Sequence, residues 1–184
     1  MPSQSKEEQV LTLFLENSPL KHWHFEEIVQ QAKVTRAVAN KWLRLYCKEG
    51  LIKKIKELGK FPYFTSGSNN PAYLARKKIY ALDKIYQSGL IDHLLALEGP
   101  KTIILFGSLA RGDWYKDSDL DLFIYGSSEG LDKQKYEKRL KWEIELHQFE
   151  TKEELQSVKT GLLQNVINGY LLKGDIQDFA EMKV

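Results

Sequence analysis

The sequence predicts an α+β protein built in two parts with a helical connector between them. Apolar residues recur at helical spacing through most of residues 1–66, which end in a short hairpin. Residues 67–98 form the connector. Within residues 99–184, two apolar runs separated by a polar turn indicate neighbouring strands of a small mixed sheet with flanking helices.

Turn and capping signals set the expected boundaries in the first part. Thr35 is a good N-cap and Gly50 a good terminator for the third helix. The expected helices are Glu7–Glu16, Phe25–Gln31 and Arg36–Glu49, and the expected hairpin strands are Leu51–Ile55 and Phe61–Thr65. Three helices followed by a hairpin resemble a winged helix-turn-helix domain, which assigns residues 1–66 to such a domain.

The charge distribution favours a nucleic-acid surface on the first part. Residues 1–70 hold 11 basic and 7 acidic residues (net +4), and residues 71–184 hold 16 and 18 (net −2). In winged domains the third helix enters the major groove. The expected DNA contacts are Arg36, Asn40, Lys41 and Arg44 on that helix, and Lys53, Lys54 and Lys60 on the hairpin. A solvated basic face and a protein-pairing surface remain alternatives, and a homodimer is expected by analogy with paired winged domains.

The connector is expected to pack on the sheet of the second part, opposite its carboxylates. Pro71 suits the first position of a helix over Ala72–Gln87, and a short helix follows at Leu90–Leu97. Helical spacing places Leu74, Ile79, Leu82 and Ile85 on the inward face of the first of these helices.

Two aspartates mark the start of one strand of the second part. Side chains alternate faces along a strand, so Asp119 and Asp121 share one face and Leu120 and Leu122 the other. Adjacent carboxylates repel each other and are favourable when a divalent cation lies between them. Mg²⁺ is the usual cation for carboxylate and phosphate oxygens.

The preceding strand, Ile103–Phe106, ends at a turn suited to a phosphate. Gly107 allows the backbone to approach a ligand closely. A helical turn from Ser108 to Arg111 would direct free N–H groups to the same place, and both side chains can add donors.

Gly107-Ser108, ten further residues, and then Asp119-Leu120-Asp121-Leu122 resemble the signature of the DNA polymerase beta-type nucleotidyltransferase superfamily, in its minimal branch. Ser118 and Arg111 also fit that pattern. The resemblance implies transfer of a nucleoside monophosphate from a nucleoside triphosphate, with ATP expected, by a site with two Mg²⁺ ions that Mn²⁺ can replace. Gly107, Ser108, Arg111 and Ser118 would then bind the nucleotide.

The resemblance also implies a third metal-binding carboxylate on the next strand. Trp142–His147 alternates as a strand should, and Glu145 is the preferred candidate, with Glu143 on the same face left open. Relatives often carry aspartate in a V-D-L setting, so I-E-L is a departure here. His147 is interpreted as a strand-end histidine.

The loop between the glycine turn and the aspartates, and the elements after the motif, complete the second part. Trp114 and Tyr115 would either stack on a nucleotide base or pack within their loop. Thr151 and Glu154 form a capping box, a helix is expected at Leu162–Asn168 and a strand at Tyr170–Leu172, and the last residues are expected to fray.

Composition excludes several classes of protein. No apolar run approaches the roughly 20 residues of a membrane span, the first residues lack a signal-peptide pattern, and the single Cys47 predicts a reducing cytoplasm.

Three functions stay open. They are an enzyme acting on a protein or small-molecule acceptor, a DNA-binding regulator with a non-catalytic nucleotide-sensing domain, and an antitoxin-type nucleotidyltransferase acting on a partner protein.

Overall fold

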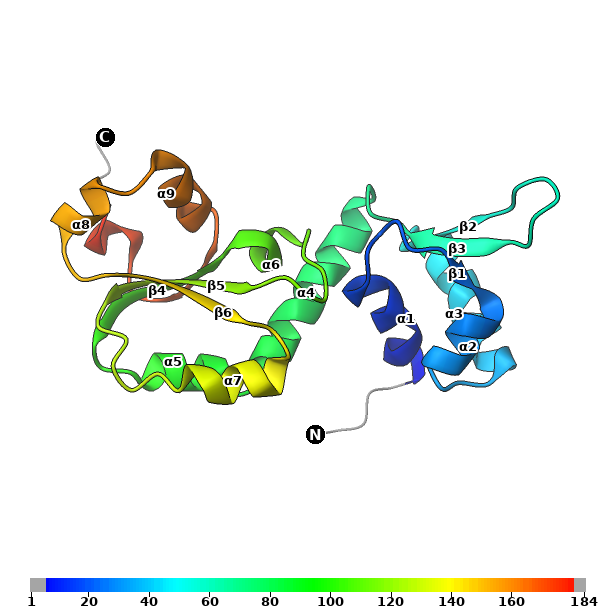
Figure 1. The fold of residues 1–184 in the computed structure, drawn as a ribbon, viewed down its shortest axis with the longest axis horizontal. Coiled ribbons are helices and arrows are strands. Elements are labelled where there is room, and N and C mark those ends of the chain that lie inside the picture. Colours follow the sequence, from blue (N-terminus) through cyan, green and yellow to red (C-terminus); the bar gives the residue numbers. More distant parts are fainter. Residues whose placement is uncertain (1–5, 181–184) are drawn as a thin grey trace. The chain divides into compact units, whose positions relative to one another are not determined.

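A computed structural model describes residues 6–180 of the chain (Figure 1). The chain separates into two compact units, Met1–Lys77 and Lys78–Val184. The boundary between them falls inside the segment 67–98 that the sequence analysis assigned to a connector.

The first unit combines helices with a small antiparallel sheet. Its helices are α1 (Lys6–Glu16), α2 (Phe25–Gln31) and α3 (Arg36–Lys48), and its strands are β1 (Trp23–His24), β2 (Ile52–Ile55) and β3 (Tyr63–Ser66). The strand order is β1-β3-β2. The predicted helices and both hairpin strands are confirmed within one or two residues. β1 was not predicted, because two residues are too few for an alternating pattern to be visible.

Local interactions explain where α3 begins and ends. The Thr35 hydroxyl accepts a hydrogen bond from the Val38 N–H, as expected of an N-cap. Gly50 lies at φ +73° just after the helix, a conformation that glycine adopts without a steric penalty. Both signals were readable in the sequence, and both set the predicted boundary.

The second unit surrounds a larger sheet. Its elements are α4 (Pro71–Gln87), which spans the boundary between the units, α5 (Leu90–Ala96), β4 (Pro100–Phe106), α6 (Gly107–Arg111), β5 (Leu120–Gly126), α7 (Lys133–Leu140), β6 (Ile144–Phe149), α8 (Lys152–Gln156), α9 (Thr160–Ile167), β7 (Tyr170–Lys173) and a 3₁₀ turn (Ile176–Asp178). The capping box of Thr151 and Glu154 opens α8 as predicted.

The sheet of the second unit is mixed, which confirms the α+β fold. Its strand order is β6-β5-β4-β7. β4 runs antiparallel to β5 and β7, whereas β5 and β6 are parallel. A parallel pair requires a crossover connection, and α7 lies in that connection.

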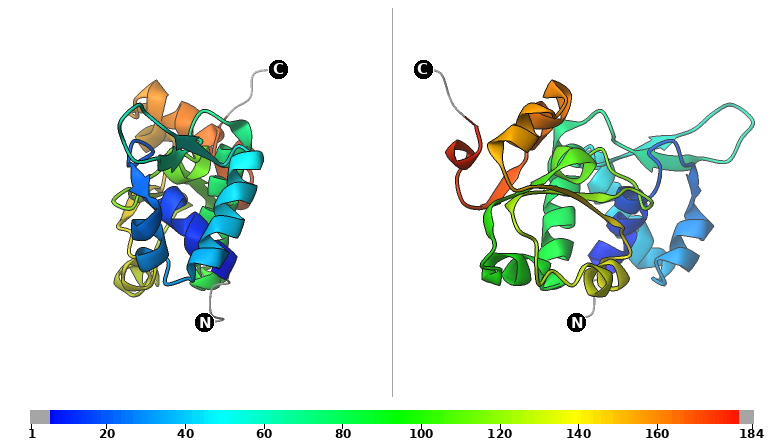
Figure 2. Two further views of the ribbon diagram at one scale, coloured as in Figure 1. Left: turned by 90° about the vertical axis from the view of Figure 1, so that its right-hand side faces the viewer. Right: turned by 60° about the vertical axis from the view of Figure 1, so that its left-hand side comes forward.

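Two apolar layers cover the two faces of this sheet. Ile103, Leu105, Leu122 and Ile124 point to one face and pack in a core with residues of α4, α5 and α7. Phe106 and Phe123 point to the other face, with residues of α8, α9 and the 3₁₀ turn. Figures 1 and 2 show α5 and α7 on one side of the sheet and α8 and α9 on the other.

The connector prediction is confirmed for residues 78–98 with one correction. Ala81 and Ile85 of α4 are buried against the sheet face opposite Asp121. Ile79, predicted to point inward, is 58% exposed. At about 100° per residue, Ile79 lies about 200° around the helix from Ala81, so the two side chains cannot share a face.

No helix among residues 6–180 is both long enough and apolar enough to cross a membrane. The expected fraying of the last residues concerns 181–184, which lie outside the described residues. Just before them, Phe179 is buried in the core beside Phe123.

Leu122 provides a test of this core. It is 1% exposed on β5, so we expect Leu122→Ala to lower the free energy of unfolding by about 2–5 kcal/mol, because apolar packing is removed and a cavity remains. The matched control is Leu95→Ala on α5, where the side chain is 46% exposed and the expected loss is below about 1 kcal/mol. Chemical denaturation measures both, and equal losses would contradict the buried position of Leu122.

Candidate functional site

One row of residues across the sheet brings together two of the acidic side chains that the sequence singled out, Asp121 and Glu145. Asp119, predicted to share a strand face with Asp121, lies just before β5 and outside this row. Phe106, the last residue of β4, pairs with Asp121 of β5, and Asp121 pairs with Glu145 of β6. The end of β4 and the beginnings of β5 and β6 therefore meet at one edge of the sheet. Strand register, rather than a loop conformation, brings Asp121 and Glu145 together.

Gly107 is required at this edge for a steric reason. It follows Phe106 directly, and a Cβ atom built on it would lie 1.8 Å from Oδ2 of Asp121. Its φ of +74° is also a conformation that L side chains rarely adopt. The absence of a side chain therefore lets the Asp121 carboxylate lie directly against the turn between β4 and α6.

The carboxylates at this edge repel one another. Burial raises the pKa of Asp121 above its ordinary value, and the nearby charges of Glu145 and Asp119 raise it further. Asp121 is half-buried, whereas Asp119 and Glu145 are exposed. A raised pKa in the folded state means that ionised Asp121 opposes folding as the pH rises through that pKa. A bound cation would remove this penalty, so the site fits a divalent metal.

His147 joins the same cluster, which the sequence analysis did not anticipate. One potential ligand atom from each of Asp121, Glu145 and His147 lies within 4.8 Å of the others. Nε2 of His147 is 3.4 Å from Oε1 of Glu145. Residues two apart on a strand share a face, and that spacing from Glu145 was the available signal for His147.

Glu143, the alternative third carboxylate, lies in a different setting from Glu145. Its backbone carbonyl accepts a hydrogen bond from the Leu120 N–H, and its side chain lines a cavity of about 330 Å³. Glu143 does not belong to the cluster around Asp121. The geometry therefore favours Glu145 over Glu143 as the carboxylate beside Asp121.

The same cavity includes Asp119 and two lysines that the sequence analysis missed. It is lined by Lys116, Asp117, Ser118, Asp119, Lys141, Trp142 and Glu143. Lys141 ends α7 with φ at +62°, a left-handed conformation that is uncommon outside glycine. A single lysine gives no indication in the sequence of what it lies beside, so only the fold shows that Lys116 and Lys141 line the cavity with Asp119.

The expected nucleotide-binding side chains differ in their surroundings. Ser108 is half-buried in the first turn of α6. Arg111 is exposed, and its Nε lies 3.2 Å from Oδ2 of Asp113. The Ser118 hydroxyl accepts a hydrogen bond from the Tyr115 N–H at 2.8 Å and closes the turn before β5.

Trp114 neither stacks on a base nor packs only within its loop, because it lies in the hydrophobic core. Trp114 is 0% exposed, stacks on Tyr80 with 6.0 Å between ring centroids, and meets Trp142 edge to face at 5.3 Å. It is therefore part of the core and cannot stack on a base. Tyr115, at 45% exposed, remains at the surface.

The expected DNA contacts on the first unit are all exposed. Arg36, Asn40 and Arg44 are spaced by four residues and share one face of α3. Arg36 pairs with Glu26 at 2.8 Å and Lys60 with Glu57 at 2.6 Å, which reduces the positive charge those two residues offer.

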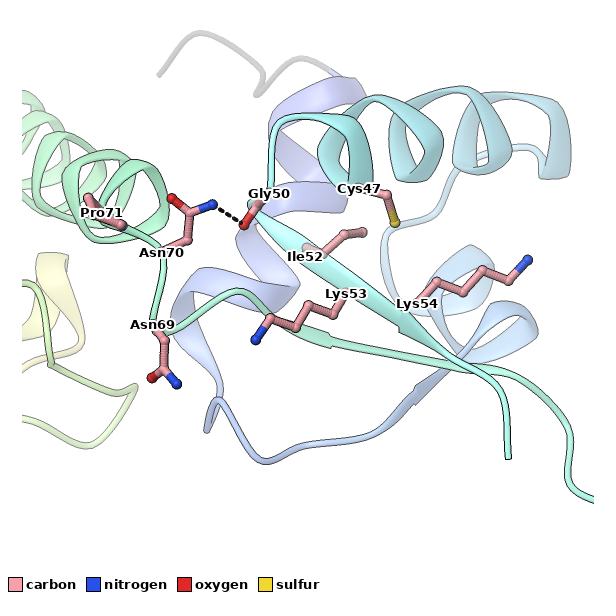
Figure 3. Close-up of a pocket in the computed structure, with 8 residues that line it drawn as sticks. All are labelled: Cys47, Gly50, Ile52, Lys53, Lys54, Asn69, Asn70 and Pro71. Atoms are coloured by element: carbon pink, nitrogen blue, oxygen red, sulfur yellow. Dashed lines mark hydrogen bonds between the residues drawn. The ribbon is translucent and has the colours of Figure 1, made fainter. Parts of the chain in front are cut away.

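Two lysines of β2 border a broad surface cavity of about 710 Å³ (Figure 3). Lys53 and Lys54 are adjacent in the strand and point in opposite directions, as strand geometry requires. The Asn70 side chain donates a hydrogen bond to the Gly50 carbonyl and fixes one wall of the cavity. The first unit therefore carries a basic surface with polar walls.

Residues 88–167 match the family model of the nucleotidyltransferase domain. This match lies within the second unit and includes the sheet edge that carries Gly107, Asp121 and Glu145.

Other comparisons are more distant. A solved structure described as "Crystal structure of the toxin-antitoxin with AMP-PNP" is 29% identical to this chain. The match covers 52% of this chain and 75% of the other, with a TM-score of 0.35, which does not establish a shared fold. No curated protein is significantly similar to the chain.

Gly107 allows a direct test of the geometry at the sheet edge. We expect Gly107→Ala to lower the free energy of unfolding by about 1–2 kcal/mol or more, because of its left-handed backbone, and to displace Asp121. Calorimetric titration with Mn²⁺ should then show weakened binding.

The matched control for this substitution is Gly161→Ala in α9. A Cβ atom at Gly161 meets nothing within 4 Å, so alanine should leave metal binding intact and raise stability by about 0.5–1 kcal/mol. Metal affinity that is unchanged in Gly107→Ala would contradict the close approach of the turn and Asp121.

Proposed function

We propose that the second unit transfers a nucleoside monophosphate from a nucleoside triphosphate, with ATP as the expected donor, to the hydroxyl group of an acceptor. The observation that carries this proposal is the pairing of Asp121 with Glu145 directly beside the Gly107 turn. The match of residues 88–167 to the nucleotidyltransferase domain supports it independently.

The reaction would proceed by attack of the acceptor oxygen on the α-phosphorus of the bound triphosphate. The bond from that phosphorus to the bridging oxygen breaks, pyrophosphate leaves with the electron pair, and the acceptor's proton passes to a carboxylate of the site. Asp119, Asp121 and Glu145 would hold Mg²⁺. When bound, Mg²⁺ neutralises phosphate charge and lowers the pKa of the acceptor hydroxyl.

The chain's own groups would orient the triphosphate. Gly107 leaves room for the phosphate next to the carboxylates, and the Ser108 and Ser118 hydroxyls can donate hydrogen bonds to it. The Arg111 guanidinium would leave its ion pair with Asp113 and neutralise the negative charge that develops on the phosphate during transfer. Lys116 and Lys141, in the cavity beside Asp119, suit an anionic group of the nucleotide or of the acceptor.

A second proposal concerns the first unit, which we infer to bind DNA. Its exposed basic side chains on α3 and β2 support this proposal, as does the order of its helices and hairpin, which resembles a winged helix-turn-helix domain. Arg36, Asn40, Lys41 and Arg44 would face the groove, and Lys53, Lys54 and Lys60 would contact phosphates.

The catalytic proposal predicts loss of transfer when the aspartates become neutral. We expect Asp119→Asn combined with Asp121→Asn to reduce Mg²⁺-dependent incorporation of labelled ATP by about 10³-fold or more, since metal contacts supply several kcal/mol of transition-state stabilisation. Without metal, thermal stability should not fall, because ionised Asp121 opposes folding.

Asp92→Asn is the control for this experiment, since Asp92 is exposed on α5 and lies outside the site. It should retain full incorporation. Undiminished turnover in the double variant would refute the mechanism.

The DNA-binding proposal predicts a change in salt dependence. In the full chain, Lys53→Ala plus Lys54→Ala should weaken DNA binding similarly for all sequences. The slope of log K against log salt should fall by about one for each phosphate that the protein no longer neutralises. Lys138→Ala, exposed on α7, is the control. Fluorescence anisotropy over a salt series measures the slope, and an unchanged slope would exclude these lysines as phosphate contacts.

A further inference from the structure

His147 lies where a metal ligand would lie. On β6, His147 lies two residues after Glu145 and on the same face of the sheet. Asp121 is paired with Glu145 on the neighbouring strand β5 and shares that face. The three side chains thus converge, with one ligand atom from each within 4.8 Å of the others. The convergence follows from strand register, so it does not depend on a flexible loop.

The orientation of the imidazole ring is fixed by its neighbours. The ring packs edge to face against Phe106, with 5.2 Å between centroids and 60° between planes. Nε2 lies 3.4 Å from Oε1 of Glu145, and only 23% of the His147 side chain is exposed. With Nε2 beside Glu145 and a ring nitrogen within 4.8 Å of a carboxylate oxygen of Asp121, the imidazole can reach a cation that these carboxylates bind.

We propose that His147 is a ligand of the metal position formed by Asp121 and Glu145, and that this position prefers a transition-metal dication such as Mn²⁺ to Mg²⁺. The inference rests on the proposed function because it shares those carboxylates. Mg²⁺ prefers an octahedral set of oxygen ligands, whereas imidazole suits transition metals, so a nitrogen in the set shifts the preference.

The competing explanation is that a protonated His147 acts as a counter-ion to Glu145 and never touches a metal. Both explanations use the same contact of 3.4 Å, and the metal's own spectroscopic signal separates them. A nitrogen bonded to Mn²⁺ couples to its electron spin, and an imidazolium beside a carboxylate does not.

The test is pulsed electron paramagnetic resonance of Mn²⁺ added to the full chain, free of any histidine tag and without nucleotide. We expect the electron spin of Mn²⁺ to couple to a histidine nitrogen. The frequency of this coupling should change when the protein is grown with ¹⁵N-labelled histidine. His147→Gln should abolish the coupling and weaken Mn²⁺ binding by about tenfold or more, with a smaller effect on Mg²⁺ in competition titrations. His24→Gln, exposed on β1, is the matched control and should change neither.

The outcomes distinguish this inference from the proposed function. Mn²⁺ that binds without nitrogen coupling, and is lost in Asp121→Asn, would overturn the role of His147 and leave the carboxylate site standing. Nitrogen coupling that persists in His147→Gln would also overturn it. Absence of Mn²⁺ binding at millimolar concentration, with no difference in Asp121→Asn, would overturn both the inference and the metal site of the proposed function.

Discussion

The contact between the Gly107 turn and the Asp121 carboxylate is the constraint on which the site depends. Any side chain at Gly107 would collide with Oδ2 of Asp121, so the turn and the strand can be this close only with glycine. This contact brings the backbone of the Gly107 turn next to the Asp121 carboxylate at the edge of the sheet. The register of β4, β5 and β6 then sets which further side chains can reach it.

The apolar packing on both faces of the sheet stabilises β5 and offsets the electrostatic cost of its Asp121 carboxylate. Asp121 carries an electrostatic cost, seen in its raised pKa, which arises from burial and from Glu145 and Asp119. The fully buried side chains of Leu122 and Phe123 next to it anchor β5 between two cores. The cost at the edge is tolerated because packing elsewhere fixes the strand, and a bound cation would turn the same carboxylates into favourable ligands.

Most elements were predictable because their signals are local. The Thr35 cap, the Gly50 terminator and the capping box at Thr151 each define a helix end within a few residues. An apolar run after a polar turn indicated β5, and alternation indicated β6. β1 was missed because two residues show no period. Ile79 was assigned to the wrong face because α4 is apolar on more than one side, and only its neighbours decide which side is buried.

The sequence by itself determined the Gly107 turn, the strand that carries Asp121 and the alternation of β6, because each of these depends on residues close together in the chain. It did not show that Asp119 lies before β5 and outside the cluster of Asp121, Glu145 and His147. Only the tertiary structure decided that Glu145 rather than Glu143 lies beside Asp121, that His147 joins them, and that Trp114 is core. Those facts depend on which residue of one strand faces which residue of another. Register is a property of the assembled sheet, and no single segment encodes it.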